Sequence, residues 1–168
     1  VSMTDRLFQR IDEARDDLIA LTQDLIKIPT LNPPGAHYAD ICDYLDRRLS
    51  ASGFKTSLVR AEGAPGDSDQ HPRWNLIARH DGTRTGDCVH FNSHTDVVEV
   101  GHGWTRDPFG GEVADDKIYG RGACDMKGGL ASSIIAAEAF IAEHPDYAGA
   151  IEISGTADEE SGGYGGVA

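Results

Sequence analysis

The 168-residue sequence has few cysteines and no long apolar run. Cys42, Cys88 and Cys124 are odd in number, widely spaced and form no CxxC pair. This pattern argues against a disulfide framework and against a thiolate zinc knuckle, and it predicts three reduced, mostly buried thiols. No stretch approaches the ~18 apolar residues of a membrane span. The first residues also lack the charged-then-apolar pattern of a signal peptide.

Basic residues are scarce, with 15 lysines and arginines against 28 acidic residues and a formal net charge of −13. Nucleic-acid binding draws its affinity from basic side chains that displace counterions, so we expect neither a nucleic-acid nor a membrane partner. We expect a cytoplasmic protein. A hydrophobic content of 39% with 20 glycines is near the globular average and predicts one folded domain.

Apolar residues recur at three- and four-residue steps in three segments, which predicts amphipathic helices. The first helix is expected from Asp5 to Ile28, and proline and glycine predict a turn at 32–35. The second helix is expected around Ile41 to Leu49, and the third from Gly129 to about Glu143.

Short β-branched and aromatic runs predict strands at 54–59, 75–78, 88–92 and 150–154. The stretch after Gly101 is expected to be irregular. Strands interleaved with helices predict an α/β fold with a mixed, largely parallel sheet flanked by helices. In such folds, sites form beyond the carboxyl ends of the strands.

Three groups of polar residues follow these strands or precede the third helix. His94 and Asp96 follow one strand, Asp125 lies in a glycine-rich turn, and Glu159 and Glu160 follow the last strand. Each group alone has an ordinary explanation: a strand-end cap, an ion-paired turn or a solvated acidic loop. Together they supply one imidazole and several carboxylates, the donors that bind two divalent ions.

Five motifs follow one another along the chain: HTDVV at 94–98, DPF at 107–109, IYGRG at 118–122, DMKGG at 125–129 and EESGG at 159–163. In this order they resemble the metal-dependent amidohydrolases that include acetylornithine deacetylase, succinyl-diaminopimelate desuccinylase, aminoacylase and carboxypeptidase G. The resemblance extends from about Leu7 to Gly163 and includes the turn at 32–35.

The resemblance implies a role for each of these residues. His94 would bind one metal ion, with Asp96 supporting its imidazole, and Glu160 would bind the other ion. Asp125 would bridge both ions, and Glu159 would be the general base. Two divalent ions are implied, with Zn²⁺ first and Mn²⁺ or Co²⁺ as substitutes. A cis peptide bond between Asp125 and Met126 is implied as well.

The resemblance further implies a binuclear zinc aminopeptidase-like catalytic domain that hydrolyses an N-acyl amino acid or related small amide. Each ion would have two ligands here, whereas catalytic zinc usually has three. We therefore interpret residues 1–168 as the N-terminal part of this catalytic domain. The C-terminal part and a lid and dimerisation domain would lie outside the chain, in the same or a separate polypeptide. The complete enzyme is expected to be a homodimer.

Two alternatives stay open from the sequence. One is a non-catalytic relative that only binds ligands, and the other is a truncated, inactive fragment with an uncovered sheet face. The histidines outside the motifs are predicted to be structural or solvent-exposed, although His102 could line the cleft. They are His37, His71, His80, His90, His102 and His144.

Overall fold

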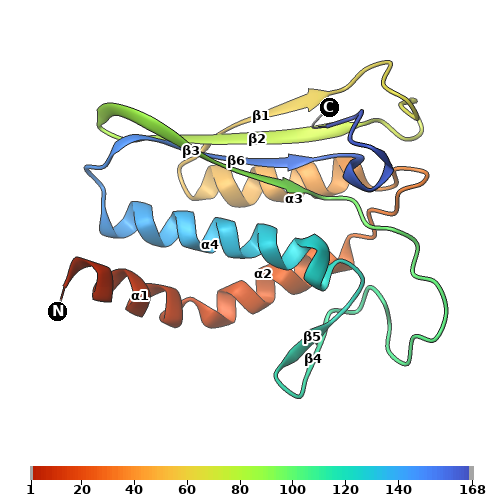
Figure 1. The fold of residues 1–168 in the computed structure, drawn as a ribbon, viewed down its shortest axis with the longest axis horizontal. Coiled ribbons are helices and arrows are strands. Elements are labelled where there is room, and N and C mark those ends of the chain that lie inside the picture. The colour runs from red at the N-terminus through yellow and green to blue at the C-terminus, as the bar shows by residue number, and fades with distance from the viewer. Residues whose placement is uncertain (1, 167–168) are drawn as a thin grey trace.

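The computed structural model describes residues 2–166, in which a four-stranded sheet lies against a layer of helices (Figure 1). The sheet contains β1 (Lys55–Arg60), β2 (Trp74–Asp81), β6 (Ala148–Thr156) and β3 (Arg84–His94), in that order. The helices are α1 (Met3–Glu13), α2 (Arg15–Lys27), α3 (Tyr38–Ala51) and α4 (Gly128–Glu143). Short helical turns are η1 (Ala123–Lys127) and η2 (Glu159–Ser161), and β4 (Glu112–Ala114) and β5 (Lys117–Tyr119) form a separate hairpin.

The predicted mixed sheet flanked by helices is confirmed, but the sheet is less parallel than we expected. β1 pairs antiparallel with β2, β2 pairs antiparallel with β6, and only β3 pairs parallel with β6 among the residues described. The reason is that β6 inserts between the consecutive strands β2 and β3, so it must oppose one of them. The parallel pair places His94 opposite Thr156, and both strands end at the same edge.

The predicted helix from Asp5 to Ile28 is wrong as a single element, because the chain breaks at Ala14 into α1 and α2. No proline or glycine marks this break. Tertiary contacts accompany the break. Arg10 of α1 donates a hydrogen bond to Glu143 at the end of α4 (2.6 Å), whereas α2 continues toward η1.

The expected irregular stretch after Gly101 contains the β4–β5 hairpin, which we did not predict. Its two-residue turn is formed by Asp115 and Asp116, whose φ angles are 51° and 56°. Aspartate tolerates this left-handed conformation, and two such residues match the turn that favours a tight hairpin. The pair of aspartates was therefore an available signal.

The core lies between the sheet and the apolar faces of α2, α3 and α4. These helices bury leucines and isoleucines at helical spacing. Each fully buried side chain contributes roughly 1.5–3 kcal/mol to the stability of the fold. The members with no exposed surface are Leu25, Ile41, Leu45, Leu49, Leu76, Ala78, Leu130, Ala131, Ile134 and Ile153.

Two expectations about the chain surface can be compared with this structure. Cys42 is buried, but Cys88 and Cys124 are exposed, so the prediction of mostly buried thiols was wrong. Cys88 lies on the edge strand β3, and Cys124 lies in η1. Within residues 2–166, none of the helices combines the length and apolar character needed to cross a bilayer.

Candidate functional site

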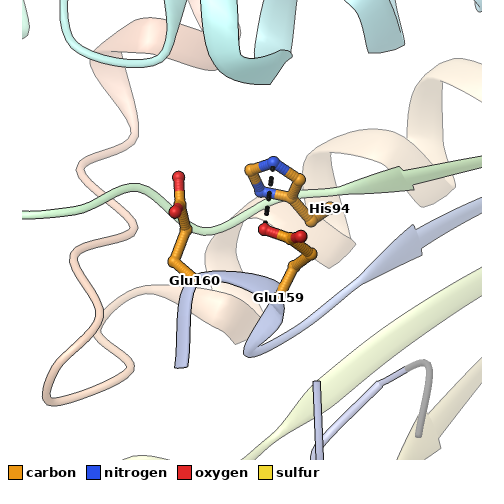
Figure 2. A group of neighbouring side chains, drawn as sticks. All are labelled: His94, Glu159 and Glu160. Atoms are coloured by element: carbon orange, nitrogen blue, oxygen red, sulfur yellow. Dashed lines mark ion pairs between the residues drawn. The ribbon is translucent and has the colours of Figure 1, made fainter. Parts of the chain in front are cut away.

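The predicted site residues come together where β3 and β6 end. His94 is the last residue of β3, and η2 begins three residues beyond the end of β6, so the parallel pair brings His94 beside Glu159 and Glu160. Ligand atoms of these three residues all lie within 4.8 Å of one another. Figure 2 shows both glutamates extending from η2 on the same side as the imidazole. His94 Nε2 lies 3.7 Å from Glu159 Oε2.

Asp125 reaches the same site from the helix layer. It lies in η1, directly before α4, and its peptide bond to Met126 is cis, as the resemblance implied. His94 Nε2 donates to Asp125 Oδ1 at 3.0 Å. The Asp125 side chain remains 74% exposed, so it is accessible to a ligand.

Asp96 is fully buried and organises the site. Its carboxylate accepts hydrogen bonds from the backbone N–H groups of Glu159 (3.2 Å) and Glu160 (3.1 Å), and from Asn32 Nδ2 (3.0 Å). It also lies 3.4 Å from His94 Nδ1, which donates at 3.0 Å to the Asp96 backbone carbonyl. One carboxylate therefore orients the imidazole and holds the turn that carries both glutamates.

The ionisation of the site follows from these contacts. Burial alone would lower the pKa of His94, but hydrogen bonds with Asp96 and Asp125 outweigh it and raise that pKa to about 9. Burial would raise the pKa of Asp96, yet hydrogen bonds from His94 and Asn32 hold it below its usual value. Burial, together with the neighbouring carboxylates, raises the pKa of Glu160.

The donor set fits a divalent cation of borderline hardness. One imidazole nitrogen and several carboxylate oxygens converge, and excess negative charge of this kind favours a bound cation over mutual repulsion. By position alone Glu159 could bind a metal as readily as Glu160. Among the residues described, the cluster takes its only imidazole from His94. His80 instead forms a hydrogen bond with Tyr147, and His90 forms one with Ser154.

Asn32 is not among the predicted site residues, yet it is buried and bridges Asp96 to Ser161 Oγ (2.8 Å). An asparagine before two prolines is typical of a turn, and that interpretation concealed its second role. Arg73 and Tyr38 were not predicted either, and both contact Asp158 beside the glutamates. Nothing in their local sequence indicates these contacts, because they lie 85 and 120 residues from Asp158.

Lys127 is fully buried beneath the site, where its Nζ donates to the Ile28 carbonyl at 2.6 Å. Burial lowers its pKa from 10.5 to about 7. The unfolded chain therefore binds more protons than the folded protein between these values, so this lysine makes stability rise as pH increases through that window.

We expect the free energy of unfolding of the wild-type protein to rise, relative to Lys127→Met, by up to about 1.4 kcal/mol per pH unit in this window. Urea unfolding of both proteins across the window measures the difference. A difference that stays constant with pH would show that Lys127 titrates normally in the folded state.

These residues define an α/β domain with a site at the carboxyl ends of its strands. The site is rich in carboxylates and is of a type that binds metal ions. Residues 90–168 match the family described as Peptidase family M20/M25/M40. Every motif from HTDVV to EESGG lies within this match, which confirms the resemblance seen in the motifs.

Curated relatives of similar sequence are hydrolases. The chain is 42% identical over 146 residues to succinyl-diaminopimelate desuccinylase of Cereibacter sphaeroides, covering 86% of this chain and 35% of that protein. It is 41% identical to the same enzyme of Burkholderia multivorans, covering 84% and 35%. The chain thus spans about a third of the length of the curated relatives it matches.

Solved structures share the fold. The Saccharomyces cerevisiae di-peptidase Dug1p matches with a TM-score of 0.81 and 25% identity, over 96% of this chain and 36% of that one. Human carnosine dipeptidase 1 matches with a TM-score of 0.79 and 26% identity, over 94% and 35%. A Bacillus subtilis protein described as a dinuclear metal binding peptidase of the M20 family shares the fold at 17% identity and a TM-score of 0.55, over 86% and 35%.

Proposed function

We propose that this protein forms part of a two-metal amidohydrolase that cleaves the acyl–nitrogen bond of an N-acyl amino acid, with succinyl-diaminopimelate as the first candidate substrate. The observation that carries the proposal is the approach of His94, Glu159 and Glu160 within 4.8 Å, with Asp125 in contact with the imidazole. The 42% identity to desuccinylases supports the choice of substrate.

In this proposal the chain's residues divide the work. His94 and Glu160 would each bind one divalent ion, and Asp125 would contribute its carboxylate to both. Zn²⁺ is the first choice for these residues, with Mn²⁺ or Co²⁺ as substitutes, and such an ion would supply Lewis acidity toward a carbonyl and toward water. Glu159 takes a proton from the attacking water and delivers it to the departing amine. Asp96 keeps the imidazole oriented throughout.

Each ion would then have two ligands from this chain, one fewer than catalytic zinc usually has. We propose that a histidine and an acidic residue outside residues 1–168 complete the two sites. We also propose a cytoplasmic homodimer for the complete enzyme. Native mass analysis of the protein purified from its own cells tests for an accompanying chain and for the dimer.

The structural relatives favour a second candidate substrate, a dipeptide, because two of them are dipeptidases. Both substrates can be compared in one assay of the Zn²⁺-loaded protein purified with any accompanying chain. Faster release of succinate from succinyl-diaminopimelate than of amino acids from dipeptides supports the first candidate. Failure to cleave N-succinyl, N-acetyl and dipeptide substrates would overturn the proposed function in favour of a non-catalytic relative.

Metal binding provides a test that does not depend on the substrate. Because His94 supplies the only imidazole of the described cluster, we expect His94→Ala to weaken binding of Zn²⁺ at least about ten-fold. Titration against a chromogenic chelator measures the affinity. His102→Ala is the matched control, since His102 is exposed in a loop. Equal affinities of the wild-type protein and His94→Ala would remove His94 from the metal site.

A further inference from the structure

A buried ionic cluster lies directly behind the acidic turn and takes no part in the proposed chemistry. Arg73 Nε donates to Asp158 Oδ2 at 2.9 Å, and Tyr38 Oη donates to Asp158 Oδ1 at 2.9 Å. Arg73 is 4% exposed, Asp158 is 2% exposed and Tyr38 is 1% exposed. Burying an ion pair costs desolvation that its attraction only partly repays, so such a pair is weak support for stability as such.

Asp158 immediately precedes the glutamates and has an uncommon backbone conformation, with φ 64° and ψ 17°. This left-handed residue turns the chain out of β6 and into η2. Its carbonyl accepts from the backbone N–H groups of Ser161 (3.1 Å) and Gly163 (2.7 Å), and its own N–H donates to Tyr38 Oη (3.0 Å). Aspartate tolerates this region better than most residues, and these hydrogen bonds fix Asp158 in it.

The surroundings of Arg73 leave it little freedom. Its Nη1 donates to the carbonyls of Pro34 (2.8 Å) and His71 (2.9 Å), and its guanidinium lies 5.7 Å from the centre of the Tyr38 ring. Glycines approach this cluster so closely that any side chain at their positions would collide with Arg73 or Asp158. These glycines are Gly35, Gly66 and Gly165.

The acidic turn is therefore held at two points. Asp96 binds the N–H groups of Glu159 and Glu160, and Arg73 with Tyr38 holds the preceding residue, Asp158. A shift of Asp158 would move both glutamates relative to His94, because they follow it directly in the chain.

We propose that Arg73, Tyr38 and Asp158 are positioning residues that set the direction of Glu159 and Glu160 toward the proposed metal site. This inference rests on the proposed function. Residues that orient metal ligands typically change metal affinity by about 10–100-fold when they are removed. The same change should loosen the turn in the absence of metal.

The test compares Tyr38→Phe with Tyr44→Phe in the full chain. Tyr44 is a matched control because it also lies on α3 and donates to an aspartate, Asp24 (2.9 Å), away from the turn. We expect Tyr38→Phe to bind Co²⁺ about ten-fold more weakly, with an altered visible absorption spectrum. We also expect faster hydrogen exchange at the Glu159 and Glu160 amides, with unchanged exchange in β2. Tyr44→Phe should match the wild-type protein in each measurement.

A second pair of variants tests the ion pair itself. Arg73→Met is compared with Arg60→Met, which loses ion pairs to Asp67 (3.0 Å) and Asp69 (3.2 Å) in the neighbouring loop. If Arg73→Met does not fold, Tyr38→Phe decides the question, because it removes a single oxygen.

The outcomes separate the two proposals. Normal Co²⁺ binding by the wild-type protein, with unchanged affinity, spectrum and amide exchange in Tyr38→Phe and Arg73→Met, would overturn the positioning role alone. Exchange that accelerates equally in the turn and in β2 would also overturn it, by showing general loss of stability. If the wild-type protein binds no Co²⁺, the proposed function fails and this inference fails with it.

Discussion

Replacing Glu159 with glutamine is expected to lower amide hydrolysis by about 10²–10⁴-fold while leaving the metal content nearly unchanged. Glutamine keeps the size of the side chain but cannot accept a proton from water at neutral pH. The turn should keep its position, because Asp96 holds it through the backbone N–H of Glu159 rather than through the side chain. The Glu159 side chain is 52% exposed, so the substitution disturbs little packing.

Glu160→Gln is the matched comparison, since it makes the same chemical change one residue further along the chain. There we expect metal content and activity to fall together, because Glu160 is the proposed ligand. Metal analysis and succinate release, measured on the same preparations, separate the two roles. Loss of metal from Glu159→Gln, with retention in Glu160→Gln, would show that the two glutamates have exchanged roles.

Asp96→Ala is expected to cause the largest loss of stability, about 3–5 kcal/mol in the free energy of unfolding. The substitution leaves three donors without their acceptor: the backbone N–H groups of Glu159 and Glu160, and Asn32 Nδ2. Each unsatisfied buried donor costs about 1–3 kcal/mol. For a chain of this size, the melting temperature should fall by about 10 °C.

Asp81→Ala provides the control for this change. Asp81 is also an aspartate near a strand end, but it is half exposed and pairs with Arg79 on the surface (2.8 Å). Its removal should change the free energy of unfolding far less than the removal of Asp96 does, because exposed ion pairs contribute little to stability. Thermal unfolding of the metal-free proteins compares the two, and equal melting temperatures for Asp96→Ala and Asp81→Ala would refute the organising role of Asp96.

The regular elements were largely predictable because their signals are local. Leucines and isoleucines at helical spacing place α3 and α4 within a few residues of their observed bounds. The break at Ala14 was not predictable in this way. Its neighbours favour a continuous helix, and α1 makes its contact with Glu143 far away in the sequence.

Strand pairing was the least predictable part of the sheet. The short link between β2 and β3 is typical of two neighbouring strands, yet β6 lies between them. Alternation of apolar residues indicates which face of a strand is buried, but it carries no information about its neighbour. The proportion of parallel pairs was therefore overestimated.

The candidate site was predictable to the extent that its residues lie in short sequence motifs. His94, Asp125 and Glu160 could be chosen because imidazole and carboxylate groups near strand ends or helix starts suggest a cation. Asn32 and Arg73 could not be chosen in this way, because an asparagine in a proline turn and an arginine in a loop are common in proteins of every function. Their importance arises from contacts with Asp96 and Asp158, which are distant in sequence.

The amino-acid sequence by itself determined which donors this protein has, their order along the chain, and the family that the order resembles. Only the tertiary structure decided that His94 and the two glutamates converge within 4.8 Å, and that a buried arginine and tyrosine hold the turn between them. The physical reason is that side-chain chemistry and periodicity are properties of neighbouring residues. Distances between strand ends are instead a property of how the whole core packs.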